Sequence, residues 1–201
     1  MNGTIVENMT EHTPLVIIDM QEYFYDRGYF ETAPDAEAFD DEWHSVVESI
    51  RHLVLLAKER KSPVIVLEYD YDSPTVDAIS SVLPENYACF TKETDSGANY
   101  VCEFLHRQKR RYDAVFVTGV NRGACVSDTI DDLLDRLRKP IVAVDDAIGD
   151  EEGCDYDLAQ PWTWWSRRMS RQFVTKLTKR MKKLFIGESY ETVQTWEKWD
   201  C

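Results

Sequence analysis

The 201-residue sequence lacks any apolar run close to the roughly 18 residues that a membrane-spanning helix needs. Its first residues lack the basic and apolar segments of a secretory signal peptide, so none is expected. Its five cysteines are odd in number and form no Cys-x-x-Cys pair, which disfavours a disulfide framework and a structural zinc site. These absences predict a soluble protein of a reducing cytoplasm.

Positive charge is also scarce, with 23 Lys and Arg against 37 Asp and Glu and a net charge of −14. This balance disfavours nucleic acid or a membrane as a partner. The basic residues concentrate in segment 167–183, where Met169, Phe173, Leu177 and Met181 recur every fourth residue. That spacing predicts a helix with one apolar face. Its simplest role is a surface helix docked on the core, and the alternative is a binding surface for an acidic partner or lipid.

The length favours a single domain over residues 1–201. Short apolar runs alternate with helical patterns along the chain. The runs lie at 14–19, 63–69, 88–92, 113–119, 140–146 and 183–189, and the helical patterns at about 41–60, 95–110, 123–138 and 165–182. Continuous Val- and Ile-rich strands separated by helices are typical of parallel sheets that are covered on both faces. We therefore predict an α/β, doubly wound fold with a six-stranded, mainly parallel sheet.

Three reactive side chains fall where such folds place their chemistry, at the carboxyl ends of strands. Asp19 ends the first apolar run, Lys92 ends the third, and Cys125 follows the fourth in the first turn of a helix expected from about Gly123. A helix N-terminus stabilises a thiolate, lowers its pKa and offers N–H groups to an oxyanion. Taken singly, each residue has an ordinary alternative: a buried packing cysteine, a turn or N-cap aspartate, and a solvated lysine.

Three segments resemble the signature regions of the isochorismatase-like cysteine hydrolases, which include nicotinamidases and N-carbamoylsarcosine amidohydrolases. The segments are LVIIDMQEYF (15–24), TKETDSGA (91–98) and VTGVNRGACVSDT (117–129). The third matches in full spacing, whereas the family's usual Phe after the second is Asn99 here. The resemblance implies the Rossmann-like three-layer fold of that family.

The resemblance also implies roles for the three residues. Cys125 would attack an amide-like carbon, Asp19 would accept its proton and pass it to the leaving amine, and Lys92 would orient and stabilise both. The presence of the cysteine favours C–N bond hydrolysis, since true isochorismatases of this family typically lack it. The implied enzyme is an amidohydrolase that cleaves a small amide, carbamoyl or ureido compound through a thioester.

The family pattern further implies a non-proline cis peptide at Val120–Asn121, which would aim the N–H of Asn121 beside that of Cys125 as an oxyanion hole. Gln21 and Phe24 match the first motif and are expected at the substrate. Arg122, next to the nucleophile loop, could clamp a substrate carboxylate or point to solvent.

No metal or other cofactor is expected. Nicotinamidases of the family carry an Asp-x-His metal site after the second strand, and here Asp72 stands at the His position of Asp70-Tyr71-Asp72. The four histidines lie elsewhere in the sequence. This acidic stretch, which Glu68 extends, is most simply a solvated loop, and a hard-cation site is the alternative.

The tryptophans of segment 161–165, with Trp196 and Trp199, are typical of an interface and predict a homo-oligomer, a dimer or tetramer. A competing hypothesis is a non-catalytic member of the fold that acts as a binding or interaction protein. Selective alkylation of Cys125 near neutral pH, slowed by Asp19→Asn, is expected of the enzyme and not of the binding protein.

Overall fold

The computed structural model describes residues 9–26, 36–109, 111–137 and 139–149. Apart from Met9, these residues belong to a compact unit that spans Thr10–Cys154. The predicted strand at 183–189, the basic helix at 167–183 and the Trp-rich segment lie outside the described residues. The single domain over 1–201 and the homo-oligomer therefore stay predictions.

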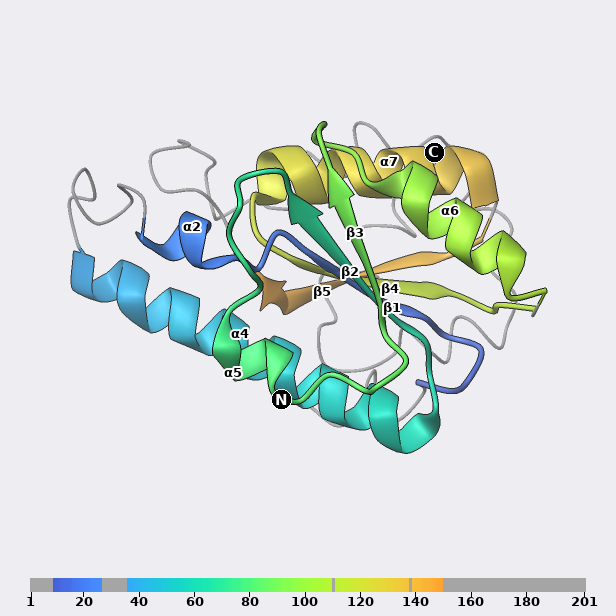
Figure 1. Cartoon of the computed structure of the whole chain (residues 1–201), viewed down its shortest axis with the longest axis horizontal. Coiled ribbons are helices and arrows are strands. Elements are labelled where there is room, and N and C mark those ends of the chain that lie inside the picture. Colours follow the sequence, from blue (N-terminus) through green and yellow to red (C-terminus); the bar gives the residue numbers. More distant parts are fainter. Residues whose placement is uncertain (1–8, 27–35, 110, 138, 150–201) are drawn as a thin grey trace, which may run out of the picture. The chain divides into compact units, whose positions relative to one another are not determined.

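Five strands of the described residues form one sheet in the order β3-β2-β1-β4-β5, and every neighbouring pair is parallel (Figure 1). The strands are β1 (Leu15–Ile18), β2 (Val64–Tyr69), β3 (Ala88–Lys92), β4 (Val115–Gly119) and β5 (Ile141–Ile148). The four residues of β1 are all fully buried, which accounts for their unbroken apolar sequence in a central strand.

Helices cover both faces of this sheet (Figure 1). The helices are α2 (Glu22–Asp26), α4 (Ala36–Arg60), α5 (Asp77–Ser80), α6 (Ala98–Arg107) and α7 (Ser127–Leu137), and the π-helical turn η1 (Arg122–Val126) precedes α7. Figure 1 shows α4 and α5 on one face and α6 and α7 on the other. The predicted doubly wound, three-layer α/β architecture is thereby confirmed. None of the described helices combines the length and apolarity that crossing a membrane requires.

The strand order reverses at β1, which lies between β2 on one side and β4 on the other. In open α/β sheets such a reversal leaves a crevice beyond the carboxyl ends of the two central strands. β1 leads directly into Asp19, and β4 leads into the loop that carries Asn121. The topology therefore directs both segments to one edge of the sheet.

Gly119 allows these two segments to approach closely. Its φ is +131°, and a Cβ at this position would lie 2.1 Å from the carbonyl oxygen of Ile18. Only glycine has neither the steric conflict nor the backbone penalty of this conformation. The end of β4 can therefore lie directly against the end of β1, which brings the Cys125 loop to Asp19.

Candidate active site

The centre of the site is a buried ion pair between Asp19 and Lys92. Lys92 Nζ lies 2.8 Å from Asp19 Oδ2, and both side chains are fully buried. Nζ also donates a hydrogen bond to the carbonyl oxygen of Thr94 and lies 4.3 Å from the centre of the Tyr69 ring. Burying either charge alone would be costly, so the two opposite charges stabilise each other in the buried site.

The backbone of Asp19 is itself unusual, with φ at +54°. Positive φ is uncommon for a residue other than glycine, and such conformations concentrate at functional sites. A hydrogen bond from the Asp19 N–H to the Leu67 carbonyl oxygen, 2.9 Å long, holds it against β2. The conformation turns the carboxylate from the end of β1 toward Lys92.

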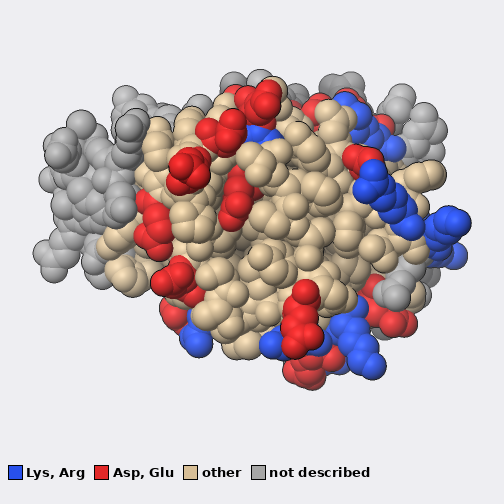
Figure 2. Space-filling view, in the orientation of Figure 1, with Lys and Arg blue, Asp and Glu red and all other residues tan. Residues whose placement is uncertain are grey.

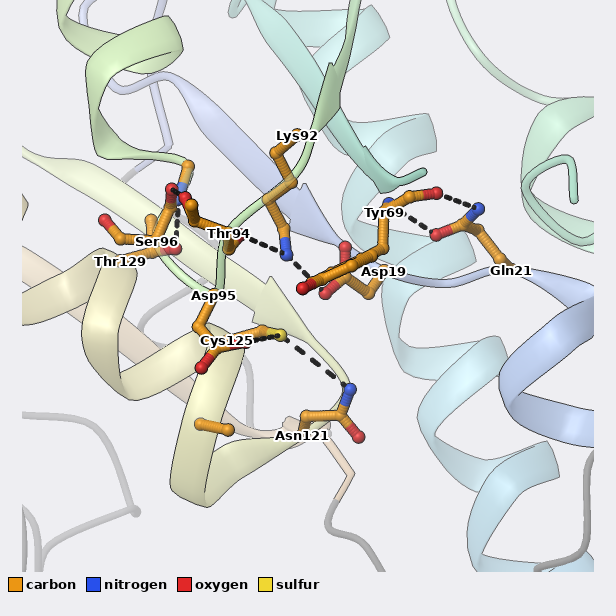
Figure 3. Close-up of polar contacts among 12 residues, drawn as sticks. Asp19, Gln21, Tyr69, Lys92, Thr94, Asp95, Ser96, Asn121, Cys125 and Thr129 are labelled. Carbon is orange, nitrogen blue, oxygen red and sulfur yellow. Dashed lines mark hydrogen bonds and ion pairs between the residues drawn. The ribbon is translucent and has the colours of Figure 1, made fainter. Parts of the chain in front are cut away.

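Cys125 lies beside this pair, and Figure 3 shows the side chains of Asp19, Lys92 and Cys125 pointing toward one another. Its thiol is 3.8 Å from Asp95 Oδ1 and 3.9 Å from Asn121 Nδ2. The predicted helix over 123–138 is present, but it begins at Arg122 and its first turn is π-helical. Single π-helical turns occur often at functional sites.

The thiol of Cys125 is not acidified in this structure. Burial, followed by the negative charge of Asp19 and its contact with the thiol, raises the pKa of Cys125 to about 12, and Lys92 opposes this increase. The prediction that the helix N-terminus lowers this pKa was therefore wrong, because burial and the adjacent carboxylate outweigh the helix terminus. At neutral pH the sulfur carries its proton, so a reaction at this sulfur requires an adjacent base.

Asp19 is placed to be that base. Burial raises its pKa above the ordinary value, and the positive charge of Lys92 limits the increase. A carboxylate whose pKa is raised accepts a proton more readily than an exposed aspartate does. The ammonium of Lys92 at the same time favours the ionised form that can accept it.

The predicted cis peptide at Val120–Asn121 is wrong, since the described residues contain no cis peptide bond. Asn121 instead adopts a left-handed conformation, with φ 64° and ψ 61°. Asparagine tolerates this conformation better than most residues. Together with Gly119 it turns the chain from β4 into η1, and the Asn121 carbonyl accepts bonds from the N–H groups of Ala124 and Val126. The oxyanion hole of Asn121 and Cys125 N–H groups stays a prediction.

Gln21 is buried, and both the nitrogen and the oxygen of its side-chain amide form hydrogen bonds with backbone groups. Nε2 donates to the carbonyl oxygens of Tyr69 and Ser73, and Oε1 accepts from the Tyr69 N–H at 2.7 Å. These bonds join the end of β1 to the loop that follows β2. The Gln21 amide therefore positions the end of β1 against that loop, and its contact with substrate stays a prediction.

Gln21→Leu is expected to destabilise the fold by about 2–3 kcal/mol, because the substitution removes three hydrogen bonds to partly buried backbone groups of Tyr69 and Ser73. Urea unfolding followed by circular dichroism measures this change. Gln108→Leu, at the exposed end of α6, serves as the control and should change stability by less than about 0.5 kcal/mol. An effect of Gln21→Leu no larger than that of the control would contradict the positioning role.

The other two residues predicted to contact substrate are Phe24 and Arg122. Phe24 in α2 is buried and packs edge-on against the rings of Tyr23 and Tyr71. Arg122 donates from a guanidinium nitrogen to the carbonyl oxygen of Ile148, 2.9 Å away. Contact of Phe24 or Arg122 with substrate stays a prediction.

The structure adds Tyr71, which the sequence suggested only as part of a loop. Its ring stacks between those of Tyr23 and Tyr69, with centroids 4.0 and 4.6 Å away. Burial, the two neighbouring tyrosines, Cys125 and Asp19 all raise the pKa of Tyr71, which places its ring near the thiol. Tyr71 is 39% exposed, so one part of this aromatic stack faces solvent beside the site.

The acidic loop after β2 does not form a metal cluster in the part of the chain that the structure describes. Glu68 accepts hydrogen bonds from the N–H and hydroxyl of Thr75, while Asp70 and Asp72 are exposed. Cys89, Cys102 and Cys125 are free thiols.

The sheet order, the two helical layers and the position of the site at the strand reversal define the isochorismatase-like three-layer α/β fold. The MAR1 ribonuclease from Caenorhabditis elegans superposes with a TM-score of 0.64 at 19% identity, over 94% of this chain and 90% of that protein. The N-carbamoylsarcosine amidase from Thermoplasma acidophilum gives a TM-score of 0.56 at 19% identity, over 79% and 92% of the two chains.

A third solved structure with this fold is an isochorismatase from Pseudomonas putida, with a TM-score of 0.53 and 19% identity over 69% of this chain and 71% of that one. No family model and no curated protein matches the sequence. At these identities the comparisons establish the shared fold.

Proposed function

We propose that the protein is a cysteine hydrolase that cleaves a C–N bond of a small amide, carbamoyl or ureido compound. The observation that carries this proposal is the buried Asp19–Lys92 ion pair beside the Cys125 thiol. A thiol whose pKa is raised to about 12 cannot act as a nucleophile at neutral pH without a base, and Asp19 is the buried carboxylate in contact with it. Lys92 keeps that carboxylate ionised in a buried place.

The proposed reaction begins when the Cys125 sulfur attacks the carbonyl carbon while its proton passes to Asp19. The N–H groups of Asn121 and Cys125 stabilise the resulting oxyanion. The C–N bond then breaks as Asp19 returns the proton to the departing nitrogen, which leaves a thioester on Cys125. Asp19 takes a proton from water, the hydroxide attacks the thioester, and the acid product and the thiol are released.

The solved structures that share this fold suggest two different reactions. The N-carbamoylsarcosine amidase of Thermoplasma acidophilum supports C–N hydrolysis, and its name describes a small carbamoyl compound. The MAR1 ribonuclease of Caenorhabditis elegans makes RNA cleavage the competing hypothesis. The net charge of −14 disfavours binding of a polyanion, so we favour the small substrate.

A non-catalytic binding protein is the other alternative, and amide turnover measured together with the reactivity of Cys125 separates it from an enzyme. With the thiol pKa near 12, alkylation of Cys125 by iodoacetamide should rise about tenfold per pH unit from pH 7 to 10. Asp19→Asn removes the charge that raises this pKa and leaves Lys92 to lower it. Cys125 in this variant should therefore be alkylated faster than in the wild type at pH 8. The sequence had led us to expect slower alkylation.

The same variant should lose amide hydrolysis, because no base remains to take the thiol proton. Peptide mass spectrometry measures alkylation of Cys125, and ammonia release from a panel of primary amides, N-carbamoyl amino acids and ureido acids measures turnover. Asp77→Asn, an exposed carboxylate in α5, is the control and should change neither. Retained hydrolysis by Asp19→Asn would contradict the proposed role of Asp19 as the base, and slower alkylation would contradict the effect of its charge on the thiol pKa.

A further inference from the structure

We infer that Asp95 is a specificity-determining residue that favours substrates with a positive charge near the scissile carbon and disfavours carboxylates. The inference rests on the proposed function, since it names the substrate class of the same site. Asp95 Oδ1 lies 3.8 Å from the Cys125 sulfur, and its side chain is exposed (Figure 3). A substrate carbon under attack by this sulfur must therefore lie close to a second carboxylate.

The loop that carries Asp95 is fixed at both ends. Before it, the carbonyl oxygen of Thr94 accepts a hydrogen bond from Lys92 Nζ. After it, the Ser96 hydroxyl donates to Asp132 Oδ2 at 2.7 Å, and the Gly97 N–H donates to the Thr129 hydroxyl at 3.0 Å. Both acceptors lie in α7, which follows the turn that carries Cys125. Asp95 is therefore held at a defined place beside the sulfur.

Asp95 differs from Asp19 in its surroundings, and this difference assigns the two carboxylates different roles. Asp19 is fully buried and paired with Lys92, whose charge it neutralises. Asp95 is exposed, and no salt bridge joins it to another of the described residues. Its charge is therefore available to a group that enters from solvent, whereas the positive charge of Lys92 is already compensated.

The surface around Asp95 has the same sign. Figure 2 shows acidic side chains gathered over the carboxyl ends of β2 and β3, where Asp70, Asp72 and Glu93 are exposed. The partly exposed ring of Tyr71 adds an aromatic face, which also attracts cations. An ammonium or guanidinium group is stabilised by such surroundings, and a carboxylate is repelled.

The inference is tested with two thiol reagents of equal length and opposite charge, the trimethylammonium-ethyl and the sulfonatoethyl methanethiosulfonates. In each reaction the Cys125 thiolate attacks the reagent sulfur and displaces methanesulfinate, so that a mixed disulfide forms. Both reagents consume the same thiolate, so the ratio of their rate constants cancels any change in the thiol pKa. Peptide mass spectrometry at low salt measures this ratio for Cys125 alone.

Asp95→Asn should lower the cation-to-anion ratio at Cys125 by about five- to tenfold, as expected for loss of one charge within several ångströms of the reacting atom. Glu93→Gln is the matched control, because it removes the same charge from the same loop without a contact to the sulfur. It should change the ratio by about twofold or less. An unchanged ratio in Asp95→Asn, or equal changes in both variants, would overturn the inference.

Turnover distinguishes this inference from the proposed function. β-Alaninamide, butanamide and succinamate are primary amides of similar length with positive, neutral and negative charge. Asp95→Asn should lower kcat/KM for the cation relative to the anion, and kcat/KM for the neutral amide is the reference that accounts for any general change in the reactivity of the thiol. Hydrolysis of the neutral amide with no change in charge preference would overturn the inference and leave the proposed function standing. If no amide is hydrolysed but Asp95→Asn lowers the cation-to-anion ratio of the two thiol reagents, only the proposed function would be overturned.

Discussion

Cys125→Ser is expected to reduce amide hydrolysis by about 10⁴-fold or more while the fold remains intact. The substitution is nearly isosteric at a buried position, so it removes the nucleophilic sulfur with little change in packing. In this variant a serine hydroxyl would have to lose its proton beside Asp19. That is harder than for the thiol, because the pKa of a hydroxyl is higher than that of a thiol. The measurement is kcat for the best amide of the panel, together with the urea midpoint of both proteins.

Cys89→Ser provides the matched control. This cysteine lies exposed in β3, outside the cluster of Asp19, Lys92 and Cys125. Its replacement should leave kcat within about twofold of the wild type. Equal losses in the two serine variants, or substantial hydrolysis by Cys125→Ser, would show that the sulfur of Cys125 is not the nucleophile.

Lys92→Met should destabilise the fold by about 3–5 kcal/mol, because it leaves the carboxylate of Asp19 buried without its partner. Methionine fills a similar volume, so the loss reflects charge and not a cavity. In this variant the pKa of Asp19 rises further, since Lys92 no longer lowers it. The destabilisation should therefore be largest above that pKa and become smaller as the pH falls and Asp19 binds a proton.

The double variant Asp19→Asn with Lys92→Met isolates the cause. It removes both charges, so it should recover a large part of the stability that Lys92→Met loses, while hydrolysis stays absent. Unfolding in urea at pH 5 and pH 8 measures the two effects. If the double variant were less stable than Lys92→Met by the full cost of Asp19→Asn alone, the two residues would not be coupled.

Much of the fold was predictable because buried parallel strands appear as continuous apolar runs. The run PLVIID predicted a strand at 14–19, and the structure has β1 at Leu15–Ile18. The helices α2 and α5 were not predicted, since five and four residues are too few to establish a helical period. Neither belongs to the alternation of strands and helices that indicated the fold class.

The sequence also indicated which residues would meet. Asp19 and Cys125 each follow a strand and Lys92 ends one, and a parallel sheet brings the carboxyl ends of its strands to one edge. The pKa of the thiol was not predictable, because it depends on burial and on the orientation of the Asp19 carboxylate. The trans peptide at Val120–Asn121 was missed because a left-handed Asn121 offers the chain another way to turn.

Asp95 and Tyr71 were missed for a related reason. Both lie in loops, where the conformation decides which side chains face the sulfur and where neither helical nor strand periodicity applies. The segment 69–72 was interpreted only by its acidic residues, although its two tyrosines form the aromatic stack. The available signal was the position of both loops directly after strands of the predicted sheet.

The central claim is that Cys125 carries the substrate during turnover, and intact-protein mass spectrometry of a reaction quenched in acid within milliseconds tests it most directly. The account predicts a mass increase equal to the acyl or carbamoyl fragment, located by peptide mapping to Cys125 and absent from Cys125→Ser. Steady amide hydrolysis with an unmodified Cys125 at every quench time, including under conditions that slow thioester hydrolysis, would contradict it.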